Sequence, residues 1–133
     1  MKYLNFSQAL LVSRMWNFLN ASNISGIVSN DVVYESFGVQ NPLVGKENLL
    51  QHMELKLETV WNAVQSGDVQ LYAKVVSIEG IFHECFVQLN QLVKGQYDES
   101  IISVSVNEDG MIRQLATNPL LPNVITHEIF PEE

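Results

Sequence analysis

The sequence predicts an α+β fold, in which helices come first and an antiparallel sheet follows. Two observations support this prediction. Apolar residues recur every three or four positions through most of the first half of the chain, as they do on one face of an amphipathic helix. After Gly67, segments rich in β-branched and apolar residues alternate with short turns, which is the pattern of a β-meander.

Three helical segments are expected. The first runs from Ser7, a residue type that can cap a helix, to about Ala21. A short helical turn is expected around residues 24–28. The third helix spans residues 46–65 and ends before Gly67, which has the backbone freedom that a helix end requires. Its apolar residues form one stripe, and its charged residues Glu47, Glu54, Lys56 and Glu58 lie off that stripe.

The expected strands begin with residues 32–37, which are β-branched, aromatic or polar. Residues 38–45 form a loop. After the third helix, strands are expected at 69–78, 81–93, 96–106 and 111–117, because each break between them carries turn-forming residues.

The turn at Lys94-Gly95 predicts a register for the hairpin around it. Cys85 then lies opposite Val104, and Val87 lies opposite Ile102. This mostly apolar face of the sheet should pack against the long helices. His83 belongs to the same face in this register.

Charge and cysteine usage exclude several classes of partner. The chain has 15 acidic and 7 basic residues, which gives a formal net charge of -8. The basic residues never occur side by side, so we expect neither nucleic acid nor an anionic membrane surface as a partner. The single Cys85 cannot form an internal disulfide, and the first residues do not resemble a secretory signal, so we expect a cytoplasmic protein.

Three segments resemble the nuclear transport factor 2-like superfamily, and within it the SnoaL-like and ketosteroid-isomerase-like group. Residues 19–27 are similar to the place where one helix ends and a short one begins. Residues 32–47 are similar to that group's strand, loop and Gly-Lys helix start, and residues 107–112 to its last hairpin. The resemblance covers about residues 8–118 and implies one domain over 1–133, with residues 119–133 as a C-terminal extension.

The resemblance also implies an architecture. In this family a strongly bent antiparallel sheet wraps into a cone around the N-terminal helices, and the open end is an apolar pocket. Members include isomerases, cyclases, hydrolases, dehydratases and non-catalytic binding or assembly domains, so the fold does not decide the function. Many members dimerise through the outer face of the sheet.

The resemblance places Glu35 where ketosteroid-isomerase-like proteins carry their general base, pointing into the cone. An apolar cavity would raise the pKa of that carboxyl and suit it to proton abstraction. The alternative is that Tyr34 points inward and Glu35 lies in water. His83 is a second candidate, as proton donor or orienting group, unless it is structural or exposed. Asp98 is a more distant polar partner.

Two parts of the usual steroid-isomerase site are missing. The oxyanion-stabilising tyrosine and the partner acid fall at Met15 and near Ile102, neither of which donates a hydrogen bond. Losing one such donor typically costs ~10²–10³ in rate, so the usual steroid isomerisation is not expected. The residues expected to line the pocket, or alternatively to form plain core, are Met15, Trp16, Leu19, Val33, Leu50, Met53, Trp61, Cys85, Ile102 and Val104.

No metal or cofactor is expected. His52 and Glu54 are two positions apart and do not share a helix face, and Cys85 is more typical of a buried hydrophobe than of a nucleophile.

Two hypotheses about the function remain. The chain binds a small hydrophobic or carbonyl-bearing molecule, with cofactor-free isomerase, cyclase or dehydratase chemistry, or it is a non-catalytic carrier or homodimeric scaffold. The outer sheet face of such a dimer would present Phe82, Phe86, Tyr97 and Ile101.

Overall fold

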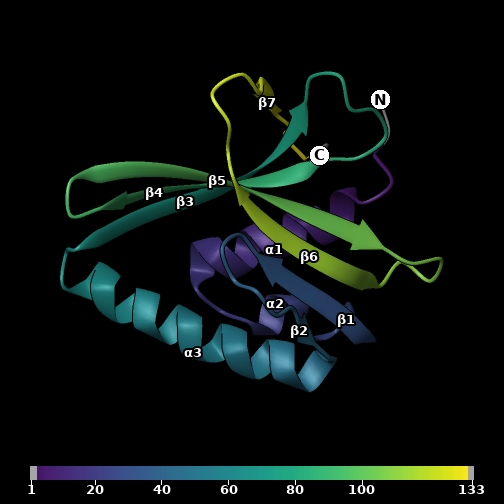
Figure 1. Cartoon of the computed structure of the whole chain (residues 1–133), viewed down its shortest axis with the longest axis horizontal. Coiled ribbons are helices and arrows are strands. Elements are labelled where there is room, and N and C mark those ends of the chain that lie inside the picture. The colour runs from purple at the N-terminus through teal and green to yellow at the C-terminus, as the bar shows by residue number, and fades with distance from the viewer. Residues whose placement is uncertain (1–2, 132–133) are drawn as a thin grey trace.

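A computed structural model describes residues 3–131 of the chain (Figure 1). Helices come first and most of the sheet follows, as the sequence predicts. In chain order the elements are α1 (Phe6–Phe18), α2 (Ser22–Ser25), β1 (Val28–Ser36), β2 (Leu43–Val44), α3 (Lys46–Gln65), β3 (Val69–Ile78), β4 (Phe86–Val93), β5 (Gln96–Val106), β6 (Ile112–Pro119) and β7 (Thr126–Glu128).

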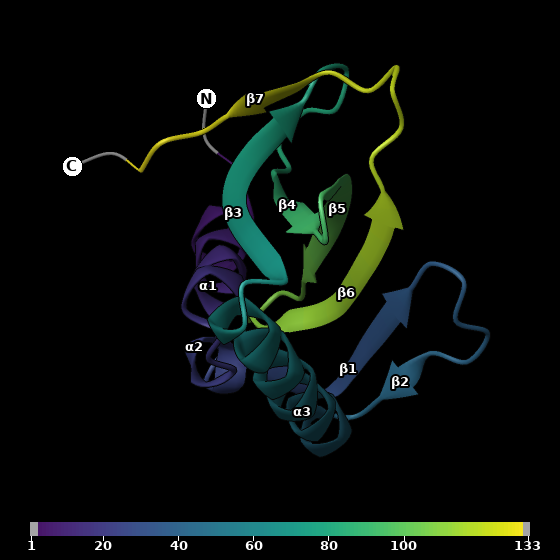
Figure 2. The ribbon, with the colours of Figure 1, turned by 90° about the vertical axis from the view of Figure 1, so that its left-hand side faces the viewer.

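The strands form one seven-stranded sheet in the order β2-β1-β6-β5-β4-β3-β7. Neighbouring strands are antiparallel except for β1 and β6, which run parallel. Figure 2 shows the sheet curving strongly, with the helices gathered on one side of it. The bent α+β fold that the sequence predicts is confirmed.

The core lies between the helices and the inner face of the sheet. Helix α1 packs against β3 and β4, and α3 packs against β1. The apolar positions of α1 recur at helical spacing, so they fall on the one side of the helix that faces the sheet. The buried residues of this core include Ala9, Val12, Met15, Met53, Leu57, Ala73, Val75, Val87, Leu89, Ile102, Val104 and Leu115.

The register of the β4–β5 hairpin is also confirmed. Val87 pairs with Ile102, as the Lys94-Gly95 turn predicts. Both turn residues have positive φ, +50° at Lys94 and +82° at Gly95, which matches the twist of the flanking strands. The two turn residues alone were therefore enough to predict which side chains of β4 and β5 reach the core.

Several boundaries differ from expectation. Helix α1 ends at Phe18, because Leu19 adopts a left-handed conformation with φ 52°. The strand expected over residues 81–93 begins only at Phe86, and His83, with φ 69°, interrupts the extended backbone before it. The sequence did not predict β2 or β7.

The segment expected to be an extension takes part in the sheet. Residues 126–128 form β7, which pairs with residues 76–78 of β3. Farther along the same edge of β3, the Asn17 side chain of α1 takes the place of a neighbouring strand. Its Nδ2 donates to the Ala73 carbonyl over 2.8 Å, and its Oδ1 accepts from the Ala73 N–H over 2.7 Å.

Within residues 3–131, no helix has both the length and the apolar character needed to span a bilayer.

Candidate functional site

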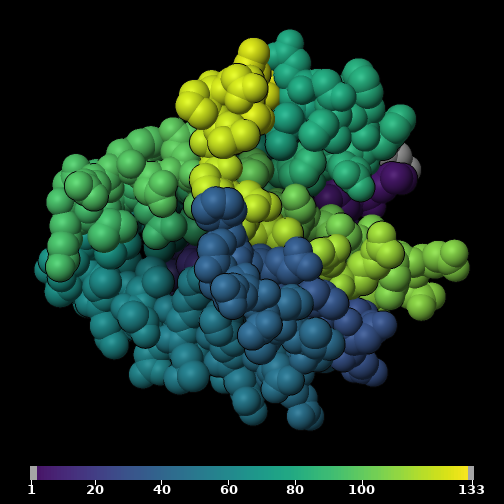
Figure 3. All heavy atoms as spheres, viewed as in Figure 1, coloured from purple at the N-terminus to yellow at the C-terminus, as the bar shows by residue number. Residues whose placement is uncertain are grey.

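A hollow lies between helix α3 and the loop that connects β1 to β2. Its volume is about 240 Å³. Figure 3 shows the dark blue β1–β2 loop projecting from the surface above the blue-teal atoms of α3. The hollow is lined by Tyr34, Ser36, Val39, Asn41, Leu43, His52 and Lys56.

Tyr34 forms the inner wall of this hollow. It is 8% exposed, because alternate residues near the end of β1 turn toward α3. The Lys56 ammonium, from the facing side of α3, donates to the Tyr34 hydroxyl oxygen over a long 3.5 Å. Since that oxygen accepts the hydrogen bond, the phenolic proton is available to a molecule in the hollow.

Lys56 is half-buried, and its surroundings are aromatic rather than acidic. Its Nζ lies 5.8 Å from the ring centroid of Trp16, a cation–π distance. Trp16 comes from α1 and is 6% exposed. Among residues 3–131 no carboxylate lies within ion-pair distance of Lys56. The hollow therefore holds a positive charge that its own lining does not neutralise.

His52 completes the polar side of the hollow, one helical turn before Lys56. Its ring centroid is 5.4 Å from that of Tyr34, with the rings tilted by 45°. The residue as a whole is exposed, but partial burial of the imidazole lowers its pKa below the usual 6.5, and the Lys56 charge lowers it further. At neutral pH the ring is neutral, so one of its nitrogens can accept a proton.

The prediction that the Glu35 side chain points into the cone is wrong. Its side chain is exposed, while Val32 and Tyr34 on the same strand are buried. The carboxylate lies beside a different hollow of about 250 Å³, between the end of β1 and β6, whose lining includes Thr117. Of the two alternatives for this strand, the one with Tyr34 inside is the one that the structure has.

His83 and Asp98 are both exposed and do not join Glu35. The backbone carbonyl of His83 accepts from the Leu4 N–H over 2.9 Å, which places this residue beside the start of α1. Asp98 pairs with Gln91, at the opposite end of β4. The catalytic roles expected for these three residues stay predictions without geometric support.

The residues expected to line the pocket separate into three groups. None of the ten lines the hollow beside Tyr34, although the buried Trp16 ring lies 5.8 Å from Lys56 Nζ, which does. Trp61 is half exposed near the end of α3. Of the remaining residues, Met15, Met53, Cys85, Ile102 and Val104 are buried in the core, and Leu19, Val33 and Leu50 are half-buried. Leu50 also lines two other hollows, beside α2 and at the start of α3.

Cys85 is held as a protonated thiol in this core. Burial raises its pKa to about 11, despite a hydrogen bond that favours the thiolate, and nearby Glu84 adds to the rise. Its Sγ donates to the Asn5 side-chain oxygen over 3.3 Å. The structure thus gives this thiol the character of a small buried hydrophobe.

Within the described part of the chain, no three His, Cys, Asp or Glu side chains are grouped to hold a metal ion.

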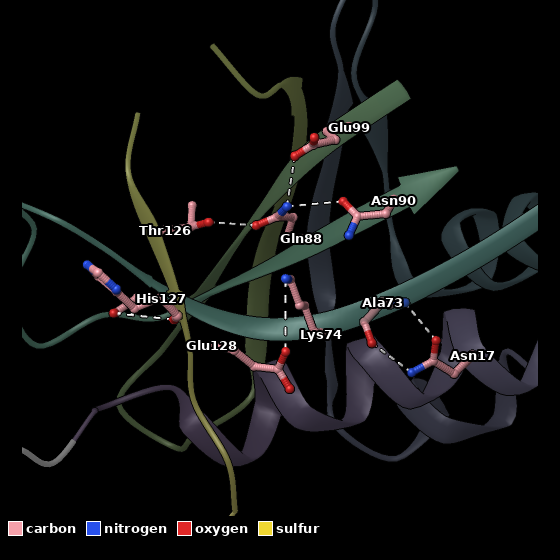
Figure 4. A network of polar contacts seen from close by, with 10 residues as sticks. Asn17, Ala73, Lys74, Gln88, Asn90, Glu99, Thr126, His127 and Glu128 are labelled. Atoms are coloured by element: carbon pink, nitrogen blue, oxygen red, sulfur yellow. Dashed lines mark hydrogen bonds and ion pairs between the residues drawn. The ribbon is translucent and has the colours of Figure 1, made fainter. Parts of the chain in front are cut away.

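The outer face of the sheet carries a polar network (Figure 4). Gln88, only 5% exposed, donates to Glu99 over 2.9 Å and to Asn90 over 3.0 Å. The Thr126 hydroxyl donates to the Gln88 side-chain oxygen over 2.8 Å. The Thr126 side chain of β7 therefore reaches this face and contacts the buried Gln88.

Sequence reasoning missed His52 and Lys56 as members of a site. Lys56 was expected on the solvent side of α3, and His52 was considered only as a metal ligand. The two residues are four positions apart, so they share one face of the helix, and this spacing was the available signal. What the sequence could not show is that Tyr34 lies against that face.

No family model matches the sequence, and no curated protein matches it. Solved structures do match. An uncharacterised bacterial protein with a cystatin-like fold from Silicibacter pomeroyi DSS-3 is 12% identical, over 84% of this chain and 74% of that chain, with a TM-score of 0.58. A nuclear transport factor 2-like protein of unknown function from Cytophaga hutchinsonii is 10% identical, over 90% and 92% of the two chains, with a TM-score of 0.58.

A third similar structure contains a ligand. It is RV0760c from Mycobacterium tuberculosis in complex with estradiol-17β-hemisuccinate, which is 12% identical, over 93% of this chain and 99% of that chain, with a TM-score of 0.62. At such low identity these likenesses establish the fold. The chain has the cystatin-like, nuclear transport factor 2-like fold.

Proposed function

We propose that this chain, with its nuclear transport factor 2-like fold, binds a small and largely apolar molecule that bears a carbonyl group. The site is the hollow between α3 and the β1–β2 loop. The observation that supports this most is the Lys56 ammonium beside the Tyr34 hydroxyl, without an acidic partner among residues 3–131, at the wall of a partly apolar hollow.

The size of the hollow limits the ligand. Drug-sized ligands occupy pockets of roughly 300–1,000 Å³. A hollow of about 240 Å³ suits a molecule of one or two rings. Val39 and Leu43 would contact its apolar body, and a carbonyl oxygen would accept hydrogen bonds from the Tyr34 hydroxyl and the Lys56 ammonium.

The same groups would serve proton-transfer chemistry without a cofactor. If a carbonyl oxygen binds at Tyr34 and Lys56, negative charge that develops on it during enolisation is stabilised where it forms. Neutral His52, on the same wall, would take the proton from the adjacent carbon. Isomerisation, cyclisation and dehydration of carbonyl compounds through an enolate all begin with such a step.

The solved structures are consistent with an apolar ligand. RV0760c, which shares the fold, was solved with a steroid derivative bound. At 12% identity the likeness itself shows the fold alone, and the bound steroid derivative supports the proposal of an apolar ligand without any shared contact. The cytoplasmic location expected from the sequence stays a prediction.

Binding is tested with 1-acetylnaphthalene, a two-ring ketone, followed by two-dimensional NMR on the full chain. We expect the Trp16 indole signal and the amide signals of residues 52–56 to shift together, with saturation at micromolar to millimolar ketone. Tyr34→Phe should weaken binding, while Tyr97→Phe, on the outer face, should not. Shifts confined to other parts of the chain would refute the site.

The alternative function is a homodimeric scaffold or a non-catalytic carrier. The scaffold is favoured by three exposed apolar side chains near the hairpin end of the outer face, Tyr72, Leu92 and Tyr97. A second copy of the chain would cover them. Light scattering distinguishes the cases, since a mass that stays at 15.0 kDa at all concentrations would exclude the dimer.

A further inference from the structure

We infer that the ligand of this hollow is a monoanion, an apolar carboxylate that pairs with Lys56 and accepts a hydrogen bond from Tyr34. This inference rests on the proposed function, because it uses the same hollow. It narrows the ligand from any carbonyl-bearing molecule to one that carries a negative charge.

The first argument is the charge balance around the hollow. The chain has an excess of acidic residues, yet its ion pairs in residues 3–131 lie elsewhere, at Lys74–Glu128 and His127–Glu79. No Asp or Glu belongs to the lining. Partial removal of an ammonium from water costs free energy that a paired charge restores. Lys56 has Trp16 as its aromatic neighbour, and a cation–π contact replaces only part of that solvation.

The second argument is the supply of donors. An ammonium has three N–H donors, and only one is directed to the Tyr34 oxygen. A carboxylate has two oxygens that can be bound at once, one by a free N–H of Lys56 and one by the Tyr34 proton. A hydrogen bond in which either partner is ionised is about twice as strong as a neutral one. A ketone has one such bond here, from Lys56, whereas a carboxylate has two, from Lys56 and Tyr34, and also pairs its charge with the ammonium.

The third argument sets the amount of charge. Facing the ligand are Lys56 and His52 from α3 and Tyr34 from β1, and the loop residues Val39 and Asn41 carry no charge. His52 is neutral at pH 7 because its partial burial and the nearby ammonium disfavour the imidazolium. The wall therefore offers one full positive charge. It matches a monoanion, and a phosphate dianion would remain half neutralised.

The experiment compares two molecules with the same rings and different polar groups, 1-naphthoate and 1-acetylnaphthalene. Each is titrated into the full chain at pH 7 and low salt, with the dissociation constant taken from the NMR shifts of the Trp16 indole. We expect 1-naphthoate to bind at least about tenfold more tightly than the ketone, the ratio expected when one hydrogen bond becomes an ion pair.

Two variants locate the source of that preference. Lys56→Met keeps most of the apolar stem of Lys56 and removes the charge. It should weaken the ketone by the loss of one hydrogen bond and 1-naphthoate by a larger factor, so that the naphthoate preference disappears. The matched control is Lys74→Met, which removes a cation from the outer face and should leave the preference intact. If Lys56→Met does not fold, the wild-type chain provides the same test: the naphthoate dissociation constant should rise with salt and that of the ketone should not.

The outcomes separate the two proposals. Equal or tighter binding of the ketone would overturn the anion inference and leave the proposed function standing. Failure of both molecules to bind would overturn both. A naphthoate preference that persists in Lys56→Met, or that Lys74→Met abolishes, would show that the anion is held at another place and would also overturn the inference.

Discussion

Replacement of Asn5 by alanine is expected to destabilise the protein more than its place near the chain start would indicate. Asn5 is 3% exposed and immediately precedes α1. Its Nδ2 donates to the carbonyls of Cys85 over 2.9 Å and Val104 over 2.8 Å. Its Oδ1 accepts from the Cys85 N–H over 2.9 Å and from the Cys85 thiol over 3.3 Å. The Asn5 side chain thus joins the start of α1 to the start of β4 and the end of β5.

The magnitude follows from the groups that Asn5→Ala would leave without partners. Each buried backbone group that loses its hydrogen bond costs roughly 1–3 kcal/mol, and three such groups are involved, the Cys85 N–H and the two carbonyls. Water can enter the space left by the amide and recover part of this cost. We therefore expect a loss of about 3–5 kcal/mol in the free energy of unfolding, a large part of the roughly 5–15 kcal/mol available to a domain.

Urea denaturation followed by circular dichroism measures the change. The matched control is Asn20→Ala, because the Asn20 side-chain oxygen accepts one exposed hydrogen bond, from the Ser22 N–H over 2.9 Å. That variant should lose no more than about 1 kcal/mol. An Asn5→Ala protein within about 1 kcal/mol of wild type would refute the reasoning, since it would mean that the buried groups of β4 and β5 find other partners at little cost.

Three further predictions concern single side chains. Asn17→Ala removes both hydrogen bonds to Ala73 and exposes the edge of β3, so this variant should aggregate faster on heating than wild type, as measured by light scattering. Cys85, whose pKa is raised to about 11, should resist Ellman's reagent at pH 8 in the native protein and react at once in urea; rapid native labelling would contradict its burial. Because the pKa of His52 is lowered in the folded protein, the unfolded chain binds the proton first as the pH falls below 6.5, so stability should decrease there, and His52→Gln should reduce that decrease.

Much of the fold could be predicted because its signals are local. The apolar stripe and the glycine after it placed α3 at residues 46–65, as the structure has it. The Lys94-Gly95 turn set the register of β4 against β5, since Gly95 readily adopts the positive φ that a two-residue hairpin turn requires. The errors fall where distant segments meet. Short β7 has little sequence signal of its own and exists because the edge of β3 is available to it.

The candidate site was harder to predict for a related physical reason. Strand β1 pairs in parallel with β6, and its register shifts between Val28 and Val33. The shift interrupts the alternation at residues 29–31, and the next two residues, Val32 and Val33, are both apolar, so alternation counted from the sequence cannot decide between Tyr34 and Glu35. The inward face of this strand is set by its contact with α3, far along the chain.

The position of Lys56 shows the same dependence on tertiary structure. On α3 alone it lies off the apolar stripe, where a lysine is normally solvated. The β1–β2 loop and Trp16 of α1 come to lie beside it only in the folded chain. A surface lysine thereby becomes a half-buried cation with an aromatic neighbour. The chemistry of the hollow thus arises from the convergence of α1, β1 and α3. A search for spaced motifs within α3 would find His52 and Lys56 but not the Tyr34 and Trp16 side chains beside them.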